Sequence, residues 1–163
     1  TFLFVMKYAR LTREQLEEMQ QEFINFLATQ SITAEEWKDI KTNQPDVAEK
    51  EIDVFSDLIW EGVLNKVEYL EHYSKQQIFL FKIDQVQISL IGVKVNNNVI
   101  DITTPEGYQW LQENLKTDAV DIYTSNKVLK EDRNKDIFAL IQQGSNITKG
   151  ELYNYFNELL ALD

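Results

Sequence analysis

The spacing of apolar residues changes from a helical to a strand-like period at Gln77, and this change constrains the fold more than any other feature of the sequence. Before it, apolar residues recur at steps of three and four, the spacing of one helix face. After it, Val86, Ile88 and Leu90 alternate with polar residues, the period of a half-buried strand. The sequence therefore predicts an α+β fold. We expect three N-terminal helices including one long helix, a three- to four-stranded, mainly antiparallel sheet, and C-terminal helices.

Two capping signals and one long apolar stripe define the predicted helices of the front half. Thr12 with Gln15, and Thr33 with Glu36, have the spacing of a capping box, in which two side chains satisfy the free N–H groups of a helix start. The third and longest helix is expected from about Asp46 to His72, because apolar residues continue at helical spacing over that range.

Three short apolar runs with turn residues between them predict an antiparallel meander after Gln77. A fourth strand is expected beyond a helix that begins after Thr104, a preferred N-cap residue. The polar stretch that follows the fourth strand is predicted to be a loop. The expected strands are Ile78–Ile83, Val86–Leu90, Val99–Ile102 and Ala119–Thr124, and the expected loop is Ser125–Asn134.

Two further helices are predicted to follow that loop. Ile137–Gln142 has the spacing of a short helix, and Gly144 after it suits the left-handed conformation common at helix C-termini. Thr148 with Glu151 has the spacing of another capping box, and apolar residues follow it at helical spacing. Because no long linker interrupts the sequence, residues 1–163 are predicted to form a single domain.

The first five residues permit two interpretations, which the sequence leaves open. Met6 is consistent with a native start, and Thr1–Val5 would then be an extension upstream of it. Alternatively, Leu3–Val5 form a short edge strand.

The charge and cysteine content restrict the expected partners and compartment. The formal net charge is −11, and residues 13–76 alone carry 6 basic and 15 acidic side chains. Because such a surface repels phosphate groups, direct binding of nucleic acid is not expected. The sequence contains no cysteine, which favours a reducing compartment and predicts a cytoplasmic protein. The longest apolar run, Phe2–Met6, is too short to cross a bilayer, so no membrane partner is expected.

The single histidine, His72, lies four residues after Glu68 on the predicted long helix. That spacing would place both side chains on one helix face, where they could share a metal ion. The favoured interpretation is a histidine near a helix C-terminus, where the helix dipole stabilises its positive charge. No confident metal site is therefore predicted. The five glycines are scattered and form no phosphate-binding loop, so no cofactor is expected.

Asp53, Asp57 and Glu61 recur every four residues on the same predicted helix, beside Trp60. Three carboxylates on one face could bind a cation or hold a raised pKa for acid–base chemistry. Amphipathic helices also place solvated acidic residues at this spacing, opposite their apolar face. An exposed tryptophan beside them would favour a partner-binding surface, because tryptophan is enriched at binding hot spots.

The sequence contains no recognisable catalytic arrangement, so the function stays open between three hypotheses. The leading one is a non-enzymatic cytoplasmic interaction module that binds a protein partner through an acidic helical face at Asp53, Asp57, Trp60 and Glu61. The first alternative is a metal- or small-molecule-dependent enzyme that uses the helix carboxylates and His72. The second is an acidic inhibitor of a basic, nucleic-acid-binding protein. The oligomeric state and the identity of the partner are not predicted.

Short motifs are distributed along nearly the whole chain from Met6. They are Met6-Lys7-Tyr8, Leu11-Thr12, Glu22–Gln30, Asp53–Leu58, Trp60-Glu61, Tyr69–His72, Gly107–Leu111 and Ile141–Gly144. Together they resemble a family of small uncharacterised proteins, a domain of unknown function, from Bacteroidota. That family has no assigned activity or catalytic residues, so the resemblance implies a bacterial cytoplasmic setting and no site residue.

Overall fold

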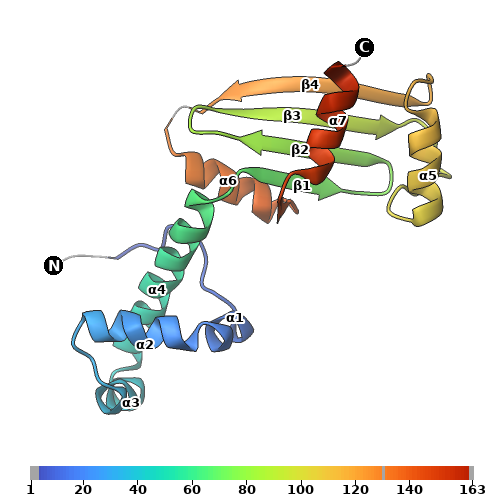
Figure 1. Ribbon diagram of the computed structural model, residues 1–163. Helices are drawn as coiled ribbons and strands as arrows, with labels where there is room; N and C mark the ends of the chain where they lie inside the picture. The colour runs from blue at the N-terminus through green and yellow to red at the C-terminus, as the bar shows by residue number, and fades with distance from the viewer. Residues whose placement is uncertain (1–3, 130, 162–163) are drawn as a thin grey trace. The chain divides into compact units, whose positions relative to one another are not determined.

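The computed structural model describes residues 4–129 and 131–161. Its elements belong to two compact units, residues 1–65 and residues 66–163, which we call the N-terminal and C-terminal units. The predicted α+β class is confirmed (Figure 1), with the described helices of the first unit preceding a sheet and helices in the second.

The described part of the N-terminal unit is helical, and its capping signals act as predicted. Thr12 and Thr33 each form a complete capping box, with Gln15 and Glu36 as the reciprocal partners. The first predicted helix is divided at Met19, so the front half has one helix more than expected. The helices are α1 (Arg13–Glu18), α2 (Gln20–Thr29), α3 (Ala34–Asn43) and α4 (Pro45–Asn65).

An aromatic cluster forms the core of this unit. The ring of Phe55 on α4 lies 5.0 Å from that of Phe23 and 5.4 Å from that of Phe26, both on α2. Trp37 of α3 meets Phe23 edge to face at 5.1 Å. Phe55 is 1% exposed, so the aromatic cluster that joins α2, α3 and α4 is closed to solvent at its centre.

The predicted end of α4 at His72 is wrong, because α4 ends at Asn65 and Tyr69–Tyr73 forms a strand. Val67 and Leu70 continue the helical spacing, and that continuation misled the prediction. The segment from Tyr69 is rich in aromatic residues, which favour strands, and it pairs with other strands on both of its edges. These pairings outweigh the local spacing.

Gly62 lies inside α4, and an added Cβ there would meet no atom within 4 Å. Glycine in a helix interior is about 1 kcal/mol less favourable than alanine. We therefore expect Gly62→Ala to raise the free energy of unfolding of the N-terminal unit by about 1 kcal/mol, measured by urea denaturation. An unchanged or lower value would contradict the open packing at this position.

The C-terminal unit contains a five-stranded antiparallel sheet in the order β4-β3-β2-β1-β5. The range of three to four expected strands was therefore slightly low. The strands are β1 (Tyr69–Tyr73), β2 (Gln77–Ile83), β3 (Gln87–Val95), β4 (Val120–Val128) and β5 (Asn146–Thr148). The helices are α5 (Pro105–Asn114), α6 (Arg133–Gln142) and α7 (Glu151–Ala161).

Several predicted boundaries in this unit are wrong for identifiable reasons. Val99–Ile102 is not a strand. Ile102 lies in a loop, its side chain is buried, and its N–H donates to the carbonyl of Lys75. The expected loop Ser125–Asn134 is partly β4 and partly the start of α6. Thr148 ends β5, and its hydroxyl accepts a hydrogen bond from Gly150 N–H, so it does not cap α7. The alternative prediction placed a short edge strand at Leu3–Val5. Phe4 and Val5 lie in no strand, and Leu3 lies outside the described residues.

The two faces of the sheet are covered differently. Leu80, Ile91 and Val93 lie on one face in the main core, together with Leu111 of α5 and Phe156 of α7. Figure 1 shows α7 crossing this face. The residues that alternate with them on β2, β3 and β4 face the other way, where α6 lies beside them.

Candidate functional site

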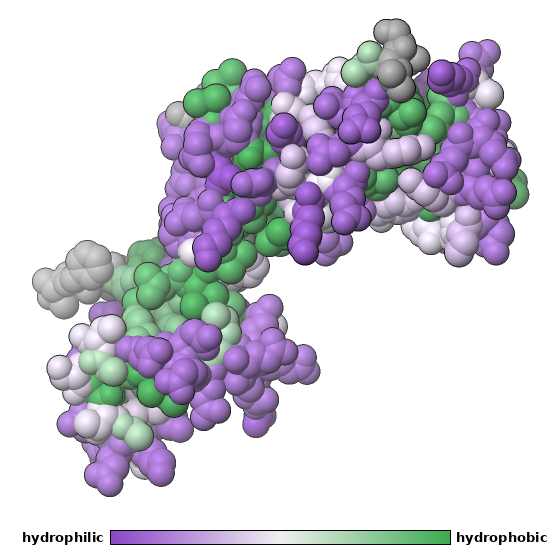
Figure 2. Space-filling model, in the orientation of Figure 1, coloured by the Kyte–Doolittle hydropathy of each residue, from purple (hydrophilic) through white to green (hydrophobic). Residues whose placement is uncertain are grey.

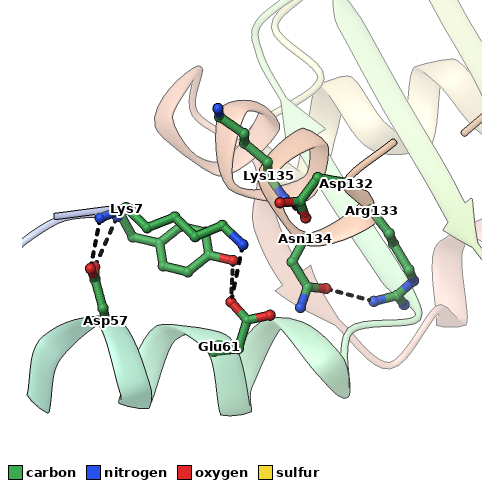
Figure 3. Close-up of polar contacts among 8 residues, drawn as sticks. Lys7, Asp57, Glu61, Asp132, Arg133, Asn134 and Lys135 are labelled. Atoms are coloured by element: carbon green, nitrogen blue, oxygen red, sulfur yellow. Dashed lines mark hydrogen bonds and ion pairs between the residues drawn. The ribbon is translucent and has the colours of Figure 1, made fainter. Parts of the chain in front are cut away.

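The acidic face of α4 is occupied by the protein's own N-terminal segment, Lys7–Leu11, which we call the strap. Asp57 accepts hydrogen bonds from the backbone N–H groups of Lys7 (2.6 Å) and Tyr8 (2.9 Å), as drawn in Figure 3. Further along the strap, Leu11 N–H donates to the buried Ser56 hydroxyl at 3.1 Å. The strap therefore runs along α4 and is held by main-chain contacts.

Glu61 and Asp53 bind strap side chains. The Tyr8 hydroxyl donates to Glu61, and Lys7 Nζ lies 3.6 Å from the same carboxylate. Burial and the hydrogen bond to Glu61 raise the pKa of Tyr8 to about 12. Arg10 Nε lies 2.5 Å from Asp53, and this contact raises the pKa of the guanidinium. All three carboxylates of this helix face therefore contact the strap of the same chain.

The three tryptophans are neither fully buried nor fully exposed. Trp37, Trp60 and Trp110 are all half-buried. Apolar side chains nevertheless reach the surface along α4 (Figure 2), and Val47, Leu58 and Val63 are exposed there. The outer surface of α4 is therefore less uniformly acidic than the sequence pattern suggested.

Asp57→Asn tests how the strap is held. Asparagine keeps the shape but replaces a charged acceptor of two backbone N–H groups by a neutral amide, and hydrogen bonds to charged groups are worth about 1.5–3 kcal/mol. We expect amide exchange at Lys7 and Tyr8 to accelerate by about tenfold or more, measured by NMR. Glu49→Gln is the control, because Glu49 is exposed and comes no closer than 4.0 Å to Arg10 of the strap. Equal acceleration in both variants would contradict this role of Asp57.

Glu68 and His72 do not share a helix, so the geometric premise of a metal pair is wrong. His72 lies on β1 and Glu68 precedes that strand. Extended chain rises about 3.3 Å per residue, which separates positions four apart by roughly 13 Å. The His72 ring lies 6.1 Å from the Phe79 ring. Among residues 4–129 and 131–161, no group of three or more His, Cys, Asp or Glu side chains could hold a metal ion.

Sequence reasoning missed Glu71, a half-buried carboxylate at the middle of strand β1. It lies on β1 opposite Leu80 on one side and Asn146 on the other, and burial raises its pKa. The Tyr73 hydroxyl nearby donates to the Ile102 carbonyl at 2.6 Å, and burial raises the pKa of this tyrosine to about 12. Assignment of this segment to a helix hid the alternation that would have placed Glu71 among the core residues.

The raised pKa of Glu71 predicts a pH-dependent effect of Glu71→Gln. A raised folded-state pKa means that the protonated acid suits the fold, and its stabilisation is lost as pH rises through that pKa. Neutral glutamine should therefore raise the urea midpoint at pH 7. The difference should disappear below the ordinary glutamate pKa of about 4.3, where both side chains are neutral. A difference that is equal at both pH values would contradict the burial effect.

A groove lies between α6 and the sheet face that α7 does not cover, with a volume of about 350 Å³. Phe81, Ile88 and Leu90 form an apolar floor, and Lys127 and Asp136 supply opposite charges. The other lining residues are Ser125, Ala139, Leu140 and Gln143. This volume lies at the small end of the range for ligand pockets, and it can take one or two large side chains of a partner.

A polar shelf continues from the groove at the start of α6. Its lining residues are Lys127, Glu131, Asp132, Lys135 and Asp136. Asp132 caps α6 by accepting from Lys135 N–H at 3.2 Å, and the Arg133 guanidinium donates to the Asn134 side chain at 3.1 Å (Figure 3). Arg133 also donates to the carbonyl of Asp84 at 3.1 Å. The helix that walls the groove is therefore fixed to the β2–β3 turn.

The groove was hidden from the sequence because α6 was predicted to begin at Ile137. The available signal was Asp132, a preferred N-cap residue that stands directly before the helix. With α6 starting at Arg133, Asp136 joins the helix and becomes a groove residue beside Ala139, which the predicted helix already contained.

Comparison with known proteins adds a family and no activity. None of the described helices is both long and apolar enough to cross a membrane. Neither curated proteins nor solved structures give a match to the chain. One family model matches residues 6–161, almost the full length of the sequence. The chain therefore belongs to DUF6495, a family of unknown function.

Proposed function

We propose that the protein is a non-catalytic interaction module that receives apolar side chains of a partner protein in the groove between α6 and the sheet. The observation that carries this proposal is the apolar floor of Phe81, Ile88 and Leu90. Phe81 and Leu90 are only half-buried, so they present hydrophobic area that a partner could cover. Lys127 and Asp136 provide charges of both signs for orienting that partner.

The groove is better supported than the acidic face of α4 as the binding surface. Asp53, Asp57 and Glu61 contact the strap, so a basic partner would have to displace residues 7–10 to reach them. Binding there remains a second candidate, supported by the acidic excess of residues 13–76, and it predicts an affinity that falls steeply with salt. Binding in the apolar groove should depend only weakly on salt.

Filling the groove tests the proposal. Ala139 is exposed on the α6 wall, so Ala139→Trp should block the groove while leaving the fold intact. Ala161→Trp, at the exposed end of α7, is the matched control. A photo-crosslinking amino acid at Gln143, in the groove, should give a discrete adduct in extracts of the native organism. The adduct should map to an apolar segment of the partner, disappear with Ala139→Trp and persist with Ala161→Trp. An adduct that survives Ala139→Trp would overturn the proposal.

The two alternative functions predict different results. An enzyme that uses helix carboxylates and His72 should bind Zn²⁺, Mn²⁺ or Mg²⁺ and gain thermal stability from it. An acidic inhibitor should bind a basic, nucleic-acid-binding protein tightly and lose that binding at high salt. For the setting, we propose the cytoplasm of a bacterium of the Bacteroidota, supported by the motif resemblance and by the absence of cysteine.

A further inference from the structure

The outer strand β4 is an unusually open edge. It is nine residues long and ends the strand order, whereas β5 at the opposite end has three residues. Its register with β3 is continuous from Val120 to Val128, so no bulge bends it. It contains no proline and a single lysine, Lys127, although proline, lysine and bulges are the usual protection of edge strands.

The hydrogen-bond pattern shows which backbone groups of β4 point outward. Just beyond its ends, Ala119 C=O accepts from Asn96 N–H, and Leu129 N–H donates to Val86 C=O. Odd-numbered residues therefore direct their backbone groups toward β3, because these directions alternate along an antiparallel strand. The outward groups belong to Val120, Ile122, Thr124, Asn126 and Val128.

The charged residues of β4 are placed so that two copies of the strand, running in opposite directions, bring opposite charges together. In an antiparallel pair centred on Thr124, all nine residues overlap and the outward-pointing residues oppose one another. Asp121 of each copy then faces Lys127 of the other, on the same side of the sheet, so the pair gains two opposite-charge contacts. Val128, which is 67% exposed, faces Val120. A register shifted by two residues keeps the backbone pairing but loses both charge contacts.

The surroundings of these charged residues are compatible with the pairing. The Asn96 side chain donates to Asp121 Oδ2 at 2.9 Å, and Lys94 lies opposite Asp121 on β3. Lys127 lies opposite Ile88 and extends along the groove wall with Asp136. The strand is also rich in β-branched residues, which suit a sheet interior.

From this self-complementarity we propose that the protein forms a two-fold symmetric dimer in which β4 pairs antiparallel with β4 of a second copy. The two five-stranded sheets then join into one continuous sheet, and both open β4 edges disappear. This proposal shares only Lys127 with the groove, and its remaining evidence is the outward backbone groups of β4 and Asp121.

Charge reversal provides the decisive test, by analytical ultracentrifugation at about 0.15 M salt, where the net charge is screened over roughly 8 Å. Asp121→Lys alone and Lys127→Asp alone should each weaken the dimer, by about tenfold or more in dissociation constant, because like charges then face each other. A mixture of the two single variants should form a heterodimer, and the double variant should recover the homodimer. A wild-type protein that stays monomeric at 100 μM, or single variants that dimerise normally, would overturn the proposal.

Two substitutions at Thr124 locate the interface without relying on charge. Thr124→Pro removes an outward N–H, so it should abolish the dimer while far-UV circular dichroism stays native. Thr124→Cys should form a disulfide-linked dimer on mild oxidation, since paired residues of this kind lie about 5.5 Å apart between Cα atoms. The protein has no other cysteine, and Val99→Cys, at a position 89% exposed in a loop, is the control. A dimer that survives Thr124→Pro, or equal crosslinking of both cysteine variants, would overturn the β4 pairing.

Discussion

Gly107→Ala is expected to lower the free energy of unfolding of the C-terminal unit by about 3 kcal/mol, at the upper end of the usual overpacking cost. A Cβ at Gly107 would lie 1.7 Å from the carbonyl oxygen of Asp101 and 2.4 Å from its carbon. These are backbone atoms, so no side-chain rotation can relieve the clash. Either α5 or the loop before it must move.

Moving the loop is energetically costly, because the backbone groups of both Asp101 and Ile102 are hydrogen-bonded. Asp101 C=O accepts from Thr104 N–H (3.1 Å) and from the Thr104 hydroxyl (2.7 Å). The next residue, Ile102, is 1% exposed and bonds Lys75 C=O at 2.9 Å. Urea denaturation of the variant should show the loss, and Gly62→Ala, in open space on α4, should show the opposite sign. Unchanged stability of Gly107→Ala would mean that α5 is not seated against Asp101.

Phe55→Ala is expected to destabilise the N-terminal unit by about 3–5 kcal/mol, the range for removal of a buried phenylalanine. Phe55 is 1% exposed and touches two aromatic rings of α2. The unit has few other fully buried side chains, so the cavity would remove much of its packing. Leu58→Ala on the same helix is the control, because Leu58 is 58% exposed and should change stability by less than about 0.5 kcal/mol.

The location of the effect distinguishes the two units. Hydrogen exchange of Phe55→Ala should accelerate throughout α2, α3 and α4, where the aromatic cluster lies. Amides of β2 and β3 belong to the other compact unit and should keep their protection longer. Uniform loss of protection across both units would show that they unfold as one cooperative body, as the prediction of a single domain implies.

Local signals predicted those parts of the fold that depend on short-range chemistry. Thr12, Thr33 and Thr104 cap helices as expected, because a hydroxyl three residues before a free N–H is sufficient for the contact. The core strand β2 was found because its sequence is a dense apolar run of β-forming residues, and β3 was found because Val86, Ile88 and Leu90 alternate with polar residues. The class and the order of the main elements follow from these signals.

Long-range pairing explains what the sequence concealed. Tyr69–Tyr73 is a strand because it pairs with β2 and with β5, and Asn146 of β5 lies far along the chain from its partner Glu71. The acidic stripe of α4 looked like an open surface because its partners lie in the distant strap. Asp57 binds backbone N–H groups at residues 7 and 8, and Asp53 and Glu61 bind strap side chains. The groove depends on how β4 and α6 meet, which spacing within either element does not specify.

Asp57 binds the strap through main-chain N–H groups, and this has a consequence for how the family can diverge. Each N–H is present in every residue except proline, so positions 7 and 8 can drift in sequence without losing these two hydrogen bonds. The carboxylate at position 57 has no such freedom. Selection that retains the strap should therefore act on position 57 of the helix. Among homologues, a proline at position 7 or 8 should accompany a change at position 57.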